Sequence, residues 1–204
     1  MQTTNSKDYI ELLEVFRIAL TRGLLEKSEV VKWADNIIAN DNEPDYFIIE
    51  LSLCGNQNLN DTISLISEFI GQDKPLLSER IILGLLYKQY LEKKITLKRA
   101  ISFINWILRE ENLTEEETSL MYNLDLDYDC VEEGYLTLGL FEEEMLRFLE
   151  IYNDFKIDNF AEWEKINSTI DGKIKLLSDT VKKEQEEVRK KYTEQTTKKW
   201  WKFW

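Results

Sequence analysis

The chain has 204 residues, of which 43% are hydrophobic and 32% are charged, so it can bury one ordinary core and carry an appendage. It contains no histidine, which excludes Ser–His and Cys–His nucleophiles and His-ligated metals, and its two cysteines are too few for a thiolate zinc site. Its 39 Asp and Glu outnumber its 26 Lys and Arg, and the resulting net charge of −13 disfavours direct binding to nucleic acid.

Capping residues and helical spacing predict a series of helices in the first part of the chain. Apolar positions recur at helical spacing from Ser6, the expected N-cap, to Gly23. Ser28 is expected to cap the second helix. Pro44 opens the third, for which a buried strand over 47–53 is the alternative. Further helices are expected over 60–69, over 76–91 and from Thr96 onwards.

The segment after these helices is acidic. Thr114 to Glu117 reads as a capping box, which begins another helix. The run Asp125 to Asp129 alternates carboxylates like the start of an EF-hand loop, but Cys130 and Leu136 stand where such a loop needs Gly and Glu. We therefore expect a solvated turn with Leu126 and Tyr128 facing inward, with weak divalent binding as the alternative. A helix through Leu140, Met145, Leu149 and Tyr152 follows.

Few turn residues and short connections predict an all-α fold. Two Pro and seven Gly are too few for most β architectures. We expect an acidic all-helical domain over 1–155, arranged as an antiparallel helical bundle or as a short α-hairpin repeat array. An offset of 66 residues superposes Leu25 to Lys27 on Leu91 to Lys93. We favour chance similarity, because any two amphipathic helices match this well when one is slid along the other. The alternative, a true repeat, would predict a small curved α-solenoid.

The last part of the chain differs in charge. Residues 1–155 carry 14 basic and 30 acidic side chains, whereas residues 156–204 carry 12 and 9. A narrow apolar stripe from Trp163 to Tyr192, interrupted at Glu184-Gln185, predicts a long C-terminal amphipathic helix over 156–197. We expect this helix to dock on the domain, held firmly only in its first half, with a coiled-coil homodimer as the alternative.

Residues 198–204 form a Lys/Trp-rich segment, predicted to be a flexible tail. Aromatic and basic side chains together suit a membrane interface, a partner groove or the acidic domain of the chain itself, and all three remain open. The residues concerned are Lys199, Trp200, Trp201, Phe203 and Trp204.

The stretch from Glu110 to Leu146 contains thirteen carboxylates and no Lys, Arg or His. Like charges at this density favour a basic protein partner, because they speed its association, although an acidic surface that serves only solubility is the alternative. The residues expected to contact the partner are Glu115, Glu116, Asp125, Asp127, Asp129, Glu132 and Glu133.

Two segments carry a resemblance to a known class of proteins. Gly23 to Ile38 and Pro44 to Ser52 resemble small acidic all-helical bacterial proteins of the toxin-immunity type, found in contact-dependent and polymorphic toxin systems. The resemblance implies binding without catalysis and transfers no catalytic residues. It adds to the charge pattern, which on its own indicates only a binding surface.

Together these observations predict a non-catalytic binding protein without cofactor or metal. No secretory h-region follows Met1 and no apolar run reaches the ~20 residues of a membrane span, so we expect a cytoplasmic protein with reduced Cys54 and Cys130. The favoured function is immunity-type inhibition of a basic toxin or enzyme. The alternative is a self-associating peripheral scaffold whose tail touches membrane, and a carboxylate-based enzyme is the third and weakest hypothesis.

Overall fold

The computed structural model describes residues 5–73, 75–110 and 112–200, and in these ranges every regular element is helical. The all-α prediction is therefore confirmed. The elements in chain order are η1 (Ser6–Tyr9), α1 (Ile10–Arg22), α2 (Lys27–Asn40), α3 (Tyr46–Leu53), η2 (Cys54–Asn56), α4 (Leu59–Ile70), α5 (Ser78–Leu91), α6 (Leu97–Ile107), α7 (Glu115–Glu132), α8 (Leu138–Leu149), η3 (Glu150–Tyr152), η4 (Ile157–Glu162) and α9 (Trp163–Trp200).

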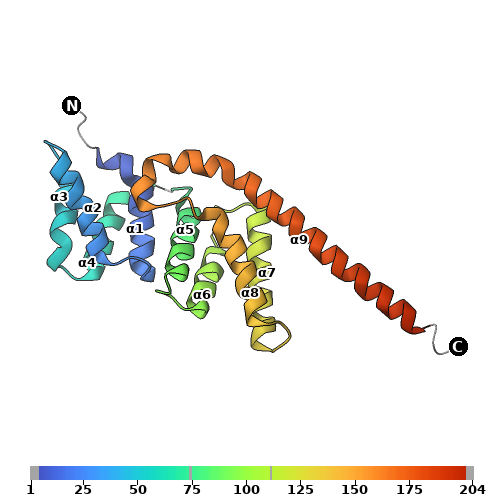
Figure 1. The fold of residues 1–204 in the computed structure, drawn as a ribbon. Helices are drawn as coiled ribbons and strands as arrows, with labels where there is room; N and C mark the ends of the chain where they lie inside the picture. The colour runs from blue at the N-terminus through green and yellow to red at the C-terminus, as the bar shows by residue number, and fades with distance from the viewer. Residues whose placement is uncertain (1–4, 74, 111, 201–204) are drawn as a thin grey trace.

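The helices form an elongated array, and α9 runs along one side of it from near α1 past α7 and then projects beyond it (Figure 1). Helix α1 packs against α4 and α5, while α2 and α3 pack on each other at the N-terminal edge. Towards the other edge, α6, α7 and α8 follow one another, and α9 contacts α7 and η3. One contiguous core of buried aliphatic and aromatic side chains runs through the whole array.

The same turn joins the two helices of three hairpins, α1–α2, α5–α6 and α7–α8. In each, a residue in the left-handed conformation ends the first helix: Gly23, Lys93 and Gly134. The next backbone N–H then donates to a carbonyl five residues back, as in a Schellman motif, at 2.8–2.9 Å. The first two of these turns align when Gly23 is paired with Lys93, which lies 70 positions later. The offset of 66 residues therefore does not relate the hairpins.

Several predicted helix starts are wrong, and so is the predicted turn over the acidic run 125–129. Asn5 caps η1, and the Glu26 and Glu29 side chains, not Ser28, form the capping box of α2. Asp45 caps α3, one residue after Pro44. The prediction that α3 is a helix, not a strand, is confirmed.

The acidic run Asp125 to Asp129 lies inside α7 and is not a turn. Tyr128 packs against Phe141 of α8, with ring centroids 5.5 Å apart. Leu126 points outward and is 45% exposed, contrary to prediction.

The first half of α9 is held by apolar contacts and by a buried polar network. Trp163, Ile170 and Ile174 are buried against the array, whereas residues 182–190 are exposed. The buried side chains of α9 thus lie in its first half. Within the network, the guanidinium of Arg80 on α5 donates to Asn167 and Asp171 of α9, each at 2.6 Å.

Candidate functional site

The seven carboxylates that the sequence analysis selected all lie on α7 or at its C-cap, but they do not form one cluster. Glu115 and Glu116 occupy the first turn, and Glu133 follows the last. Eighteen residues at 1.5 Å per residue separate the two ends by about 27 Å. A partner would therefore have to extend along α7 to contact both groups.

A depression of about 550 Å³ between α6 and α7 contains three of the seven carboxylates. Three basic side chains line the same depression, which makes this side of α7 mixed in charge. The acidic residues are Asp125, Asp129 and Glu132, and the basic residues are Arg22, Lys98 and Arg109. Asp125 also accepts a hydrogen bond from the Asn105 amide.

The C-terminal end of α7 carries negative charge where a helix is least able to accommodate it. Carbonyl groups without partners give this end of a helix a partial negative charge, which favours Lys or Arg. The last turn of α7 contains no basic residue and includes Asp129 and Glu132, with Glu133 at the C-cap. These three carboxylates therefore oppose the local electrostatics of the helix.

Asp127 faces the opposite side of α7, where a second groove of about 550 Å³ opens between α7, α8 and α9. We call this the α7–α9 groove. Three acidic side chains line it, Asp127, Glu144 and Glu184, together with Arg147 and Arg189. Its apolar lining comes from all three helices: Leu120, Leu124, Phe148, Leu177, Val181 and Val188.

Of the carboxylates in the α7–α9 groove, Asp127 is half-buried, whereas Glu144 and Glu184 are exposed. Burial raises the pKa of Asp127. Burial also raises the pKa of Glu144, and the negative charges of Asp127 and Glu184 add to that shift while Arg147 opposes it. Arg147 is engaged with Glu184 in an ion pair from α8 to α9 at 3.2 Å. The groove therefore combines apolar surface with carboxylates that a cation would stabilise.

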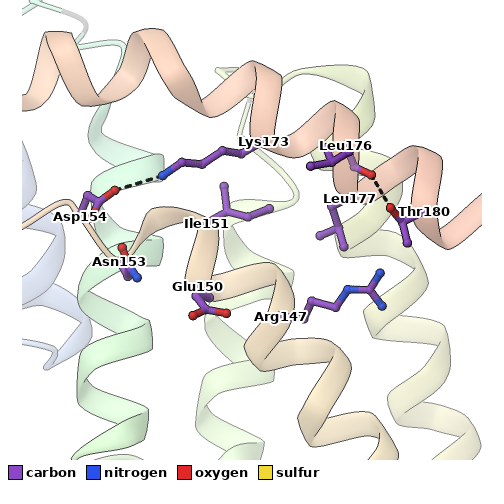
Figure 2. A pocket seen from close by; sticks show the side chains of 9 residues that line it. All are labelled: Arg147, Glu150, Ile151, Asn153, Asp154, Lys173, Leu176, Leu177 and Thr180. Atoms are coloured by element: carbon purple, nitrogen blue, oxygen red, sulfur yellow. Dashed lines mark hydrogen bonds and ion pairs between the residues drawn. The ribbon is translucent and has the colours of Figure 1, made fainter.

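A shallower depression of about 490 Å³ lies beside this groove, between α9 and the end of α8. Figure 2 shows that Lys173 reaches from α9 to Asp154, with their charged atoms 3.0 Å apart. The Thr180 hydroxyl is occupied by the carbonyl of Leu176 at 2.7 Å. The Lys173–Asp154 ion pair thus connects α9 to the segment that follows η3.

Sequence reasoning missed most of the α7–α9 groove. Glu144 belongs to the acidic run on α8. Glu142 of the same run accepts a hydrogen bond from the Tyr90 hydroxyl, whereas Glu144 lines the groove, and nothing in the run distinguishes these two positions. The available signal was the interruption of the apolar stripe at Glu184-Gln185, which marks where α9 leaves the array.

The selected tail residues fall outside what the structure describes. Lys199 and Trp200 belong to the last turn of α9 but their side chains are not described, and Trp201, Phe203 and Trp204 lie beyond residue 200. Within the described ranges, no group of three or more His, Cys, Asp or Glu could hold a metal ion. None of the helices described combines the length and apolar character needed to cross a bilayer.

Comparisons with protein-family models, with curated proteins and with solved structures found no match to this chain.

Proposed function

We propose that the protein is a non-catalytic cytosolic binding protein, an immunity-type inhibitor that neutralises a basic toxin or enzyme. Its contact surface is the acidic hairpin, defined as α7, α8 and the turn between them. The observation that carries the proposal is the placement of Asp129, Glu132 and Glu133 at the C-terminal end of α7. Charges that destabilise their own helix are expected at functional sites.

The charge of the hairpin is compensated only in part by the rest of the chain. Among its carboxylates that the structure describes, Glu117 is the one in an ion pair, with Arg80 of α5. Asp125 and Glu142 accept hydrogen bonds from the neutral Asn105 and Tyr90 side chains. Arg22, Lys98 and Arg109 line the depression beside Asp125, Asp129 and Glu132 and offset part of their charge. A basic partner would supply the missing positive charge, and long-range attraction would raise its association rate.

A charge-neutralised variant tests this proposal. Full-length protein and the variant D129N/E132Q/E133Q would each be used to capture proteins from cells that produce the chain, followed by mass spectrometry. The proposal expects a basic protein to be captured by the wild type and lost with the variant. The control D35N/E68Q neutralises exposed carboxylates on α2 and α4, at the other edge of the array, and should capture the same protein.

If the variant captures the same proteins as the wild type, or if the captured proteins are acidic, the proposal is wrong.

The exposed second half of α9 favours a second candidate function, a self-associating peripheral scaffold whose tail touches membrane. A helix with residues 182–190 exposed is available for contact with another surface. Sedimentation with anionic vesicles would compare the full chain with a chain ending at Thr197. Loss of pelleting in the shorter chain supports this function, and equal behaviour of the two removes the tail from it.

A further inference from the structure

The α7–α9 groove has the chemistry of a docking site. Val188 is 63% exposed, and Val181 is half-buried on the same face of α9. Apolar side chains on one wall therefore face water, while Asp127 and Glu144 line the other wall. An occupant that suits both walls needs large apolar groups interspersed with positive charge.

Residues 198–204 of this chain have that composition. They comprise three Lys, three Trp and one Phe. An indole or phenyl ring would cover Val181 and Val188, and a Lys ammonium would interact favourably with Asp127 and Glu144, since Glu184 is already paired with Arg147. The segment therefore supplies both aromatic rings and positive charge. No other segment of the sequence combines the two at comparable density.

The continuity of α9 prevents a tail from reaching the groove of its own chain. Helix α9 runs unbroken to Trp200, which lies about 16 Å beyond Arg189 at the ordinary helical rise. No Gly or Pro follows Gly172 in the sequence, so nothing favours a reversal of the chain before the tail. Trp200, the last residue that the structure describes, therefore lies well beyond the groove that Arg189 lines.

We infer that the Lys/Trp-rich segment of a second copy occupies the α7–α9 groove, so that two chains exchange their C-terminal segments. The two α9 helices would run antiparallel and cross near residue 192. In that register residues 198 and 199, both Lys, fall opposite Glu187 and Glu186 of the other copy. Each copy thus completes the site of the other, and the interface is isologous.

The exchange has a consequence for regulation, and this part rests on the proposed function. A basic partner that contacts Asp127 would compete with the exchanged segment. The dimer and the inhibitory complex would then be mutually exclusive. A high concentration of the chain would favour the dimer over the complex.

The inference is tested with the full chain and a fluorescent peptide of residues 193–204. Sedimentation velocity should show a concentration-dependent dimer, and the peptide should bind the chain. The variant D127N/E144Q should weaken peptide binding at least tenfold, while the control D35N/E68Q leaves it unchanged. The tail variant W200S/W201S/W204S should sediment as a monomer, and its intact groove should still bind the peptide.

Three results would overturn the inference: a monomer at every concentration, a dimer that persists in the tail variant, or peptide binding that D127N/E144Q leaves intact. Peptide that binds phosphatidylserine vesicles but not the chain would also overturn it. The proposed function is tested separately, because the capture experiment uses the carboxylates at the end of α7, outside the groove. Loss of exchange with retained capture contradicts this inference alone.

Discussion

Arg80 on α5 and Glu117 on α7 form a buried bidentate ion pair, with both N–O distances at 2.9 Å. Glu117 is 0% exposed, and it also accepts the hydroxyl hydrogen of Tyr152 at 2.8 Å. Burial lowers the pKa of Arg80, but Glu117 and Asp171 outweigh that effect and raise it. The pair connects the capping box of α7 to the anchor of α9.

Replacing Glu117 with Gln should destabilise the protein by about 3–5 kcal/mol, because the Arg80 charge would lose its most buried partner. Urea denaturation followed by circular dichroism measures the change. Glu116→Gln is the matched control, since Glu116 is exposed and adjacent; it should cost at most about 1 kcal/mol. Equal effects of the two substitutions would show that the ion pair does not stabilise the fold.

Gly84→Ala should destabilise the protein by about 1–3 kcal/mol, because the added Cβ would lie 2.5 Å from the carbonyl oxygen of Tyr152. The opposite effect is expected at Gly172, which lies in α9 with nothing within 4 Å of the position of an added Cβ. Gly172→Ala should therefore stabilise the protein by about 0.5–1 kcal/mol. Thermal unfolding of both variants measures the difference. If Gly84→Ala left the thermal stability unchanged, α5 and η3 would have to separate readily.

The variant D129N/E132Q/E133Q should be more stable than the wild type by about 1 kcal/mol in total, because it removes negative charge from the C-terminal end of α7. Urea denaturation at low ionic strength is the appropriate measurement, and added salt should reduce the gain. A loss of stability would show that these carboxylates have structural partners, and it would remove the main support for the proposed function.

The variant D127N/E144Q should change the pH dependence of stability. Raised pKa values mean that the folded chain holds protons that the unfolded chain releases at its ordinary values of 3.8 and 4.5. Wild-type stability from these groups is thus complete below those values and is lost as pH rises. The variant should gain up to about 0.5 kcal/mol at pH 7, since solvent screens both groups, and nothing at pH 3. A difference independent of pH would contradict this.

Local capping chemistry made most of the helices predictable. Thr96 and the Thr114–Glu117 capping box begin α6 and α7 as expected, and Gly23 and Gly71 end α1 and α4. These signals act within one turn of helix, so they can be read from neighbouring residues. The acidic run in α7 could not be read in this way, because it has no local start or stop signal, and its contact with Phe141 comes from another helix.

The candidate site was predictable in part. The charge of the acidic hairpin is a property of the sequence, whereas its division between two sides of α7 depends on the positions of α6 and α9. Asp125 and Asp127 are two residues apart, yet they line different depressions. The α7–α9 groove joins side chains from Leu120 to Arg189, and no local pattern connects residues at such separations.

The salt dependence of association tests the central claim most directly. The basic protein captured by the full chain would be mixed with wild type, D129N/E132Q/E133Q and D35N/E68Q in stopped flow at increasing NaCl. The proposed function predicts that the wild-type association rate falls steeply with salt, and that the α7 variant associates about tenfold more slowly at low salt with a flatter dependence. Equal rates and slopes for the α7 variant and the control would contradict it.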